Sequence, residues 1–231
     1  MQRIVLLPGL ACDDELFAEQ RPALAPLGEL STSTVHFRFD TLPQMAQALL
    51  DEHPGPLTLV GSSMGGMLAL QAALLAPQRV QRIAILGSSA RADTPELLAL
   101  RSQAIELFAA GRMDEVLRAN LVFAFHPEHA GRLAERYLAM IRRAGAPALI
   151  RQNRAVMARA DLRPQLPAIT CPTLVLCGED DQLTPPECSR EIAAAIAGAA
   201  LQWLPRCGHL STMEQPEAVN TALRDWLLQT A

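Results

Sequence analysis

The stretch LVGSSMGGMLAL, residues 59–70, constrains the fold of this chain more than any other. It joins an apolar run at 57–61, typical of a buried strand, to a run at 64–76 that is apolar nearly all round, as in a buried helix. Three glycines stand at this junction, although glycine weakens both helices and strands. The junction therefore predicts a sharp turn in which larger side chains do not fit.

The same alternation of strand and helix continues along the chain. Apolar runs typical of strands lie at 3–7, 34–39, 57–61, 82–87, 173–178 and 201–205. Helical patterns lie at 43–52, 64–76, 186–197 and 215–228. Continuous apolar strands that alternate with helices indicate a parallel sheet covered on both faces. We expect an α/β fold with about six core strands in a mostly parallel sheet, and missing or minimal antiparallel strands before residue 3.

The interval from about 90 to 165 differs, because its pattern is helical. Four helices are predicted, near 94–110, 113–122, 128–143 and 147–160, with glycine or proline between them. A helical block between two strands of a parallel sheet is an insertion on the rim of the sheet. The expected domains are a core made of residues 1–90 and 166–231 and a four-helix cap, or lid, made of residues 91–165.

Composition excludes several classes of protein. Half of the 231 residues are hydrophobic and the net charge is −4, so we expect a globular chain that does not bind nucleic acid. No segment has the roughly 18 apolar residues that a membrane span needs. The N-terminus does not resemble a signal peptide. The five cysteines lack the spacing of a zinc site or a disulfide framework, so we expect a cytoplasmic protein.

The turn at 61–65 has the spacing G-x-S-x-G, in the strand–turn–helix context that this motif requires. Ser63 would project above the sheet on a strained turn, while Ser62 would point into the core. The helix N-terminus beneath Ser63 would favour developing negative charge. For the pentapeptide alone, a Gly/Ser-rich loop without chemistry is the alternative.

A serine hydroxyl is a weak nucleophile and needs a base that a carboxylate orients. Two later strands end in candidates for these roles. Asp180 and Asp181 follow the strand at 173–178, and His209 follows the strand at 201–205. Each candidate leaves the carboxyl end of a strand, where open α/β sheets place their sites.

GSSMGG at 61–66, GEDDQLTP at 178–185 and CGH at 207–209 occur in this order. With these motifs the chain resembles the α/β-hydrolase superfamily over nearly its whole length. The resemblance implies that Ser63 is the nucleophile and His209 the base. It also selects Asp181 as the acid, because the family's acid commonly follows the loop glycine by three positions.

The oxyanion that forms during acyl transfer needs preorganised N–H donors. One expected donor is the backbone N–H of Met64, directly after the nucleophile. The resemblance implies the N–H of Leu10 as the other, in the loop after the first strand. The family usually has His-Gly where this chain has Pro8-Gly9, so this loop lacks the family's imidazole. Candidate walls for the acyl part are apolar side chains of the lid: Leu121, Phe123, Phe125 and Met157.

These residues predict a serine hydrolase that cleaves a carboxylic ester or similar acyl substrate through an acyl-enzyme, without a metal or an organic cofactor. The compact core and lid resemble small carboxylesterases, including the pimeloyl-carrier-protein methyl esterase type, and enol-lactonases. Two alternatives stay open. The same triad could hydrolyse a lactone or thioester or serve a lyase-type reaction, or the fold could be a non-catalytic ligand receptor.

Charge is distributed unevenly over the chain. Every basic residue is Arg, and residues 91–163 hold 12 Arg against 8 acidic residues in a chain of net charge −4. The densest group is Arg142, Arg143, Arg151 and Arg154. Two interpretations follow. These are solvated helix faces, or the lid is positive and attracts an anionic substrate or an acidic carrier protein.

Overall fold

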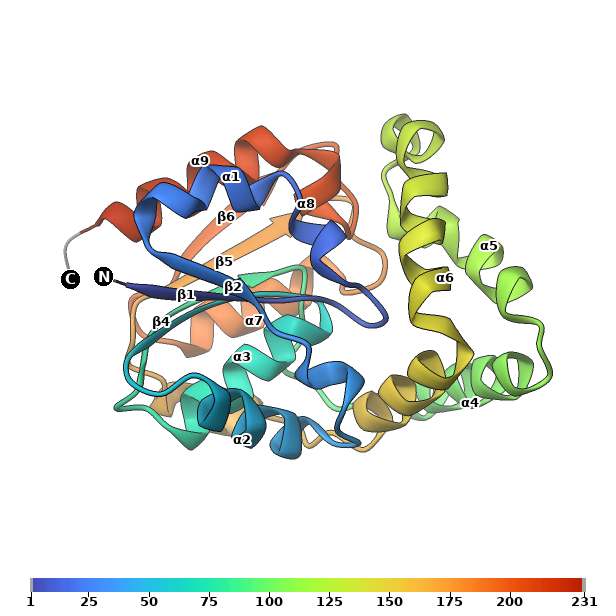
Figure 1. Cartoon of the computed structure of the whole chain (residues 1–231), viewed down its shortest axis with the longest axis horizontal. Helices are drawn as coiled ribbons and strands as arrows, with labels where there is room; N and C mark the ends of the chain where they lie inside the picture. The colour runs from blue at the N-terminus through green and yellow to red at the C-terminus, as the bar shows by residue number, and fades with distance from the viewer. Residues whose placement is uncertain (1, 230–231) are drawn as a thin grey trace.

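The computed structural model describes residues 2–229 and shows a six-stranded sheet between two layers of helices (Figure 1). The strands pair in the order β2-β1-β3-β4-β5-β6, and every pairing is parallel. The expected parallel sheet of about six strands is confirmed. The strand bounds are β1 Arg3–Leu7, β2 Glu29–Thr32, β3 Leu57–Ser62, β4 Val80–Leu86, β5 Thr173–Gly178 and β6 Ala200–Leu204.

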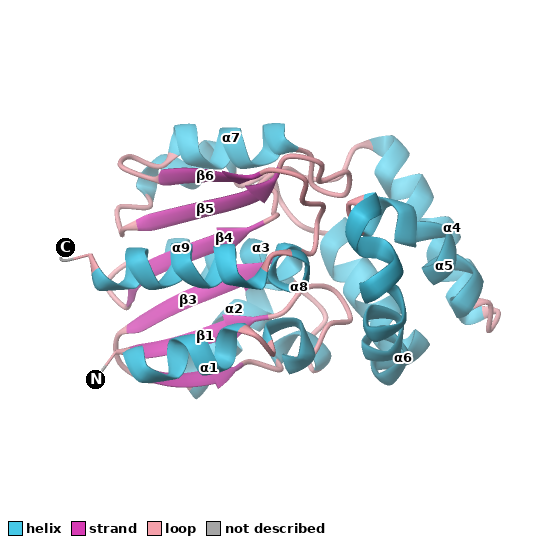
Figure 2. Cartoon of the chain, turned by 90° about the horizontal axis from the view of Figure 1, so that it is seen from above, coloured by secondary structure: helices cyan, strands magenta, loops and turns pink. Residues whose placement is uncertain are grey.

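Helices cover both faces of this sheet (Figure 1 and Figure 2). One face carries α2 (Leu42–Glu52), α3 (Met64–Leu75) and α7 (Pro186–Ala195). The other carries α1 (Gln20–Leu24), α8 (Ser211–Glu214) and α9 (Pro216–Leu228). Short turns of 3-10 helix at Asp14–Phe17, Ala25–Leu27, Val35–Phe37 and Arg163–Ala168 complete the described elements.

The side chains of β1 divide the apolar core into two clusters. Ile4 and Leu6 pack in the cluster that contains Trp226 of α9, whereas Val5 and Leu7 pack in the cluster that contains α2 and α3. This follows from the period of two in a strand, which sends successive side chains to opposite faces. Both faces of β1 are therefore buried against apolar side chains, as the unbroken apolar run predicts.

The strand predicted at 34–39 is wrong. The chain leaves the sheet at Ser33, whose N–H donates to the Leu6 carbonyl (2.9 Å), and Val35–Phe37 then form a turn of 3-10 helix. The true second strand, Glu29–Thr32, pairs with β1 alone at the sheet edge. Its residues are half-buried or exposed, so no apolar run marks it in the sequence.

Between β4 and β5 the chain forms a helical insertion of three helices: α4 (Pro95–Ala109), α5 (Met113–Ala124) and α6 (Pro127–Met157). The third and fourth predicted helices form this one element, which breaks at Gly145, where φ is 76° and ψ is 170°. The insertion stands beyond the carboxyl ends of the strands (Figure 2). The apolar core continues into it, since Leu138 of α6 belongs to the same cluster as Leu6. No helix within residues 2–229 is long and apolar enough to cross a membrane.

Two glycines allow α3 to lie almost in contact with the backbone of the sheet. A Cβ atom on Gly65 would lie 1.9 Å from the carbonyl oxygen of Leu7, and one on Gly61 would lie 2.2 Å from the carbonyl oxygen of Gly65. Both obstacles are backbone atoms, which cannot rotate out of the way as a side chain can. The turn from β3 into α3 therefore requires glycine at both positions.

We predict that Gly65→Ala lowers the free energy of unfolding by about 1–3 kcal/mol, because the added methyl group overpacks the contact between α3 and β1. Gly131→Ala is the control. A Cβ at Gly131, inside α6, would meet no atom within 4 Å. It should stabilise the chain by up to about 1 kcal/mol through helix propensity. Urea unfolding measures both, and equal stability of the two variants would contradict the close contact.

Candidate active site

Ser63 lies on the turn between β3 and α3 with φ 54° and ψ −118°. A residue other than glycine rarely adopts positive φ, and such a conformation costs about 1–3 kcal/mol. Neighbouring elements hold it there. The Ser63 N–H donates to the Leu86 carbonyl (2.9 Å), and the Ser63 carbonyl accepts from the Ser88 hydroxyl (2.7 Å) and the Gly66 N–H (2.9 Å). Ser62 is 2% exposed, as expected for a side chain that points into the core.

Asp181 and His209 form a buried pair. The Nδ1 atom of His209 lies 2.9 Å from Oδ2 and 3.0 Å from Oδ1 of Asp181. The same carboxylate accepts from the N–H groups of Leu183 and Thr184 (both 2.9 Å) and from the Thr184 hydroxyl (2.8 Å). A carboxylate bound to Nδ1 selects the neutral tautomer with its proton on Nδ1, so Nε2 carries the lone pair. The neighbouring Asp180 instead has an exposed side chain.

Burial and pairing act in opposite directions on the two groups. Burial disfavours the imidazolium, but the charge and hydrogen bond of Asp181 outweigh it, so the pKa of His209 lies above its ordinary value. Burial also opposes ionisation of Asp181. The charge of His209 and the hydrogen bonds from His209 and Thr184 prevail, and the pKa of Asp181 is lowered. The arrangement favours a carboxylate beside an imidazole that can accept a proton.

The loop after β4 joins this pair to the serine turn. Gly87 follows Leu86, whose carbonyl holds Ser63, and Gly87 has φ 50°. A Cβ atom on Gly87 would lie 3.0 Å from Oδ2 of Asp181 and 3.4 Å from Nδ1 of His209. The Asp181–His209 pair therefore packs directly on the backbone beside the carbonyl that anchors Ser63.

A buried glutamate holds the loop of His209. The Glu214 carboxylate, 3% exposed, accepts from the N–H groups of Gly208 (3.0 Å) and Leu210 (3.1 Å), on either side of His209. It also accepts from the N–H of His126 (2.8 Å), at the start of α6. Burial raises the pKa of Glu214, although the three N–H donors oppose that shift. The His209 N–H also donates to the Ala124 carbonyl of the insertion (3.1 Å). The position of His209 thus depends on the insertion.

The loop after β1 lies against the serine turn. A Cβ atom on Gly9 would lie 3.3 Å from the Cβ of Ser63, and the Cys12 N–H donates to the Gly9 carbonyl (3.1 Å). Within residues 2–229, the N–H groups of Leu10 and Met64 have no hydrogen-bond acceptor. Met64 is the first residue of α3, where helical N–H groups have no partner within the helix. Two free donors therefore lie close to Ser63.

The four residues predicted to line the acyl site lie at two places. Leu121, Phe123 and Phe125 surround Ala124, which contacts His209 through its carbonyl. Phe125 is buried and meets the Tyr137 ring edge-on at 5.5 Å, while Phe123 is 42% exposed. Met157 ends α6, at the opposite end of that helix from Phe125. Their contact with a substrate stays a prediction.

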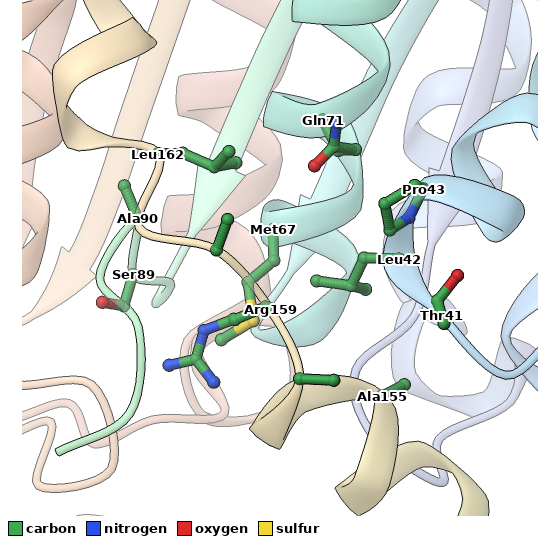
Figure 3. A pocket seen from close by; sticks show the side chains of 12 residues that line it. Thr41, Leu42, Pro43, Met67, Gln71, Ser89, Ala90, Ala155, Arg159 and Leu162 are labelled. Carbon is green, nitrogen blue, oxygen red and sulfur yellow. The ribbon is translucent and has the colours of Figure 1, made fainter.

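A cavity of about 140 Å³ lies between the start of α2, α3 and the segment that follows α6 (Figure 3). Ser63, Asp181 and His209 do not line it. Arg159 lines the cavity, but its guanidinium already pairs with Asp93 (2.8 Å) and donates to the Arg91 carbonyl (2.8 Å). The cavity therefore offers neither catalytic groups nor a free charge.

Most arginines of the densest group form ion pairs with acidic side chains. Arg142 pairs with Asp114 (2.9 Å), within the insertion. Arg143 pairs with Asp13 (2.8 Å) and Arg151 with Asp40 (3.2 Å), and both pairs cross from the insertion to the core. Asp13 also accepts from the Glu15 N–H and so caps the turn of 3-10 helix at Asp14–Phe17. Attraction of an anionic substrate or an acidic carrier protein stays a prediction.

Three buried polar residues that hold the loops of the site were not predicted from the sequence: Glu214, Gln152 and His36. A partial signal existed for Glu214, because Ser211-x-x-Glu214 has the spacing of a capping box. The structure places the N-cap one residue earlier, at Leu210, and Glu214 accepts from the Leu210 N–H. Gln152 interrupts an apolar stripe three residues after Leu149 on α6. Such a polar residue on an apolar stripe indicates a buried hydrogen bond, but not its partner.

A sequence model of the alpha/beta hydrolase family matches residues 4–222. The RutD protein of Serratia proteamaculans (strain 568), which carries the assignment of a carbamate hydrolase, is 31% identical over 196 residues, which are 83% of this chain and 73% of RutD. The pimeloyl-[acyl-carrier protein] methyl ester esterase of Nitrosomonas europaea is 27% identical over 188 residues, which are 77% of this chain and 74% of the esterase.

Solved structures agree with these sequence matches. The enol-lactonase of Burkholderia xenovorans LB400 has a TM-score of 0.88 and 27% identity, and covers 99% of this chain and 92% of its own. The family match spans most of the chain and includes all three residues of the Ser63, Asp181 and His209 set. This protein is therefore a hydrolase that belongs to the alpha/beta hydrolase family.

Proposed function

We propose that the chain is a serine hydrolase that cleaves carboxylic esters through a Ser63–His209–Asp181 triad and an acyl-enzyme. The observation that carries this proposal is the buried Asp181–His209 pair, which packs on Gly87, next to the Leu86 carbonyl that holds Ser63 on its strained turn. Buried charged groups are costly unless they are paired and hydrogen-bonded, and clusters of this kind concentrate at functional sites. The N-terminus of α3 adds a partial positive charge where the oxyanion would form.

The chemistry assigns one task to each group. His209 Nε2 takes the Ser63 proton while Oγ bonds to the ester carbonyl carbon, and Asp181 stabilises the resulting imidazolium. The carbonyl oxygen becomes an oxyanion, which the N–H groups of Leu10 and Met64 bind. Collapse of this intermediate breaks the bond to the alkoxide, which takes the proton from His209 and leaves as an alcohol. A water molecule then gives a proton to His209 while its oxygen bonds to the acyl carbon. The bond to Oγ breaks, the acid leaves, and His209 returns the proton to Ser63.

The names of the relatives support an acyl substrate, but they differ in its leaving group. Their names refer to a methyl ester, a lactone and a carbamate, all of which have a carbonyl carbon bonded to a heteroatom. The ester is our proposal, because the free N–H donors and the triad suffice for it without another group. A panel of aryl esters of increasing acyl length, set against lactones, acyl thioesters and carbamates, tests it. Turnover of any other class in preference to every ester would contradict the proposal.

We predict that Ser63→Ala lowers kcat for an aryl ester by at least about a thousandfold, because the nucleophile is lost. The fold should persist, since alanine is smaller than serine. Ser62→Ala, one residue earlier and buried in β3, should keep most of the activity. Labelling by a fluorophosphonate probe gives an independent measurement. An inactive Ser62→Ala beside an active Ser63→Ala would show that the wrong serine has been assigned.

Asp181→Asn should lower kcat by about 10⁴-fold, as in the serine-protease triad, because the amide favours the wrong imidazole tautomer. Asp180→Asn is the matched control. Asp180 is the preceding residue, its side chain is 50% exposed, and its Oδ2 lies 3.9 Å from Nε2 of His126. Steady-state kinetics should give nearly wild-type rates for this variant. Equal losses in the two variants would contradict the assignment of Asp181.

The pH dependence of kcat/KM follows from the pKa of His209. Only the neutral imidazole can accept the Ser63 proton, and Asp181 raises the pKa of His209 against the effect of burial. Activity should therefore rise with pH through a midpoint above about 6.5, the ordinary value for histidine. Rates between pH 5 and 9 measure this midpoint. A flat profile with chemistry rate-limiting is the result that excludes His209 as the base.

A further inference from the structure

The loop that carries the Leu10 N–H is held partly by side chains from outside it. Pro8 has no N–H to donate, and Ala11 has φ 56°, a strained value for a residue with a Cβ. Apart from the Cys12 N–H donated to the Gly9 carbonyl, the backbone hydrogen bonds of residues 11 and 12 go to side chains from elsewhere in the chain.

Two buried side chains supply these bonds. The Ala11 N–H donates to Oε1 of Gln152 (2.5 Å), and Nε2 of His36 lies 2.8 Å from the Cys12 carbonyl. Gln152 in turn donates from Nε2 to the His36 carbonyl (2.9 Å). Gln152 and His36 are 0% and 2% exposed. Four residues thus form a ring of hydrogen bonds that closes directly after Leu10.

The ring requires a proton on Nε2 of His36, because a carbonyl oxygen only accepts. Burial lowers the pKa of His36 to about 4, so the imidazole is neutral at the pH values where His209 can act. Every donor in the ring then faces an acceptor. A buried ring in which each polar group is satisfied is rigid, because opening it leaves unpaired groups away from water.

We propose that Gln152 is a positioning residue that fixes the Leu10 N–H for oxyanion binding. The geometry of the oxyanion site then depends on how the helical insertion is placed on the core. This inference rests on the proposed serine-hydrolase function. Gln152 lies on α6 beyond the break at Gly145, so it belongs to the insertion and not to the sheet. It supplies a brace at a loop where this chain has proline in place of the family's histidine.

The insertion has other contacts with this loop, but they are more exposed. Arg143 pairs with Asp13 and Arg136 with Glu15, and all four side chains are about a third to a half exposed. Exposed ion pairs contribute little to stability, whereas a buried donor without its acceptor is costly. The Gln152 bond to Ala11 is therefore the buried contact from the insertion to the peptide after Leu10, whose carbonyl also accepts from the Cys12 thiol (3.4 Å).

The test compares Gln152→Met with Asn153→Met. Methionine keeps the length of glutamine without its hydrogen bonds. Loss of a whole oxyanion donor costs about 10²–10³ in kcat, so a displaced donor should cost about tenfold to a hundredfold. KM should change little. The inhibition constant of phenylboronic acid, which places a boron-bound oxygen where the oxyanion forms, should rise by the same factor. The midpoint of the pH profile should not move, because His209 is untouched.

Asn153 is the matched control in the same turn of α6. It is 6% exposed, donates to the Leu149 carbonyl (2.8 Å) and accepts from Arg101 (2.8 Å), so its loss also breaks buried bonds. Asn153→Met should lower the melting temperature as Gln152→Met does, but keep kcat and the phenylboronic acid constant. Gln152→Glu keeps the acceptor for Ala11 while its carboxylate repels the His36 carbonyl, and should give an intermediate kcat.

Several results would overturn the proposal. A Gln152→Met variant with wild-type kcat and phenylboronic acid affinity would do so, as would equal losses in Asn153→Met. In the unaltered chain, the Ala11 amide should exchange with deuterium far more slowly than the Leu10 amide, and rapid exchange at Ala11 would also refute it. These outcomes are distinct from failure of the proposed function, which would appear as an active Ser63→Ala variant.

Discussion

The strained backbone of Ser63 is the constraint on which the rest of the site depends. A turn with φ 54° persists only where its surroundings over-determine it, and each contact here comes from a different element. The glycines at 61 and 65 allow α3 to touch the sheet, and β4 anchors the Ser63 N–H through Leu86. Without this packing, the serine would relax into the helix or the strand that it joins, and its hydroxyl would no longer stand above the sheet.

The parallel sheet brings the remaining groups to the same edge. The loops after β1, β3, β4, β5 and β6 all leave the carboxyl ends of their strands, so segments far apart in sequence meet there. The insertion then lies over this edge (Figure 1). It contacts the His209 loop at one end of α6 and the Leu10 loop further along the same helix. One helix with a break thus touches both the His209 loop and the Leu10 loop.

Much of this could be predicted from the sequence, because local patterns carried it. Buried strands appear as unbroken apolar runs, and the serine turn appears as a glycine spacing at a strand–helix junction. The edge strand Glu29–Thr32 could not be found in this way, because a half-exposed strand has no apolar signature. The choice of Asp181 over Asp180 needed the family resemblance, and the structure shows Asp181 against His209.

The hydrogen bonds that Gln152 makes to the loops of the site could not be predicted from the sequence, for a physical reason. Gln152 and Ala11 are 141 positions apart, and His36 and Gln152 are 116 apart. The two partners of such a hydrogen bond lie in different elements, so no local pattern in the sequence connects them. Polar residues on an apolar stripe show that a partner exists, but the fold alone decides which one it is.

The exclusive use of arginine has a consequence for the range of conditions in which the two parts of the molecule stay together. The pairs that join the insertion to the core include Arg143–Asp13, Arg136–Glu15 and Arg151–Asp40. A guanidinium keeps its proton far into alkaline solution, whereas a lysine ammonium begins to lose its charge near pH 10. A hydrolase that uses a neutral imidazole works on the alkaline side of that imidazole's midpoint. Ion pairs made by arginine remain charged throughout that interval. In the proposed mechanism, the alkaline pH that deprotonates His209 therefore does not break the pairs that hold the insertion.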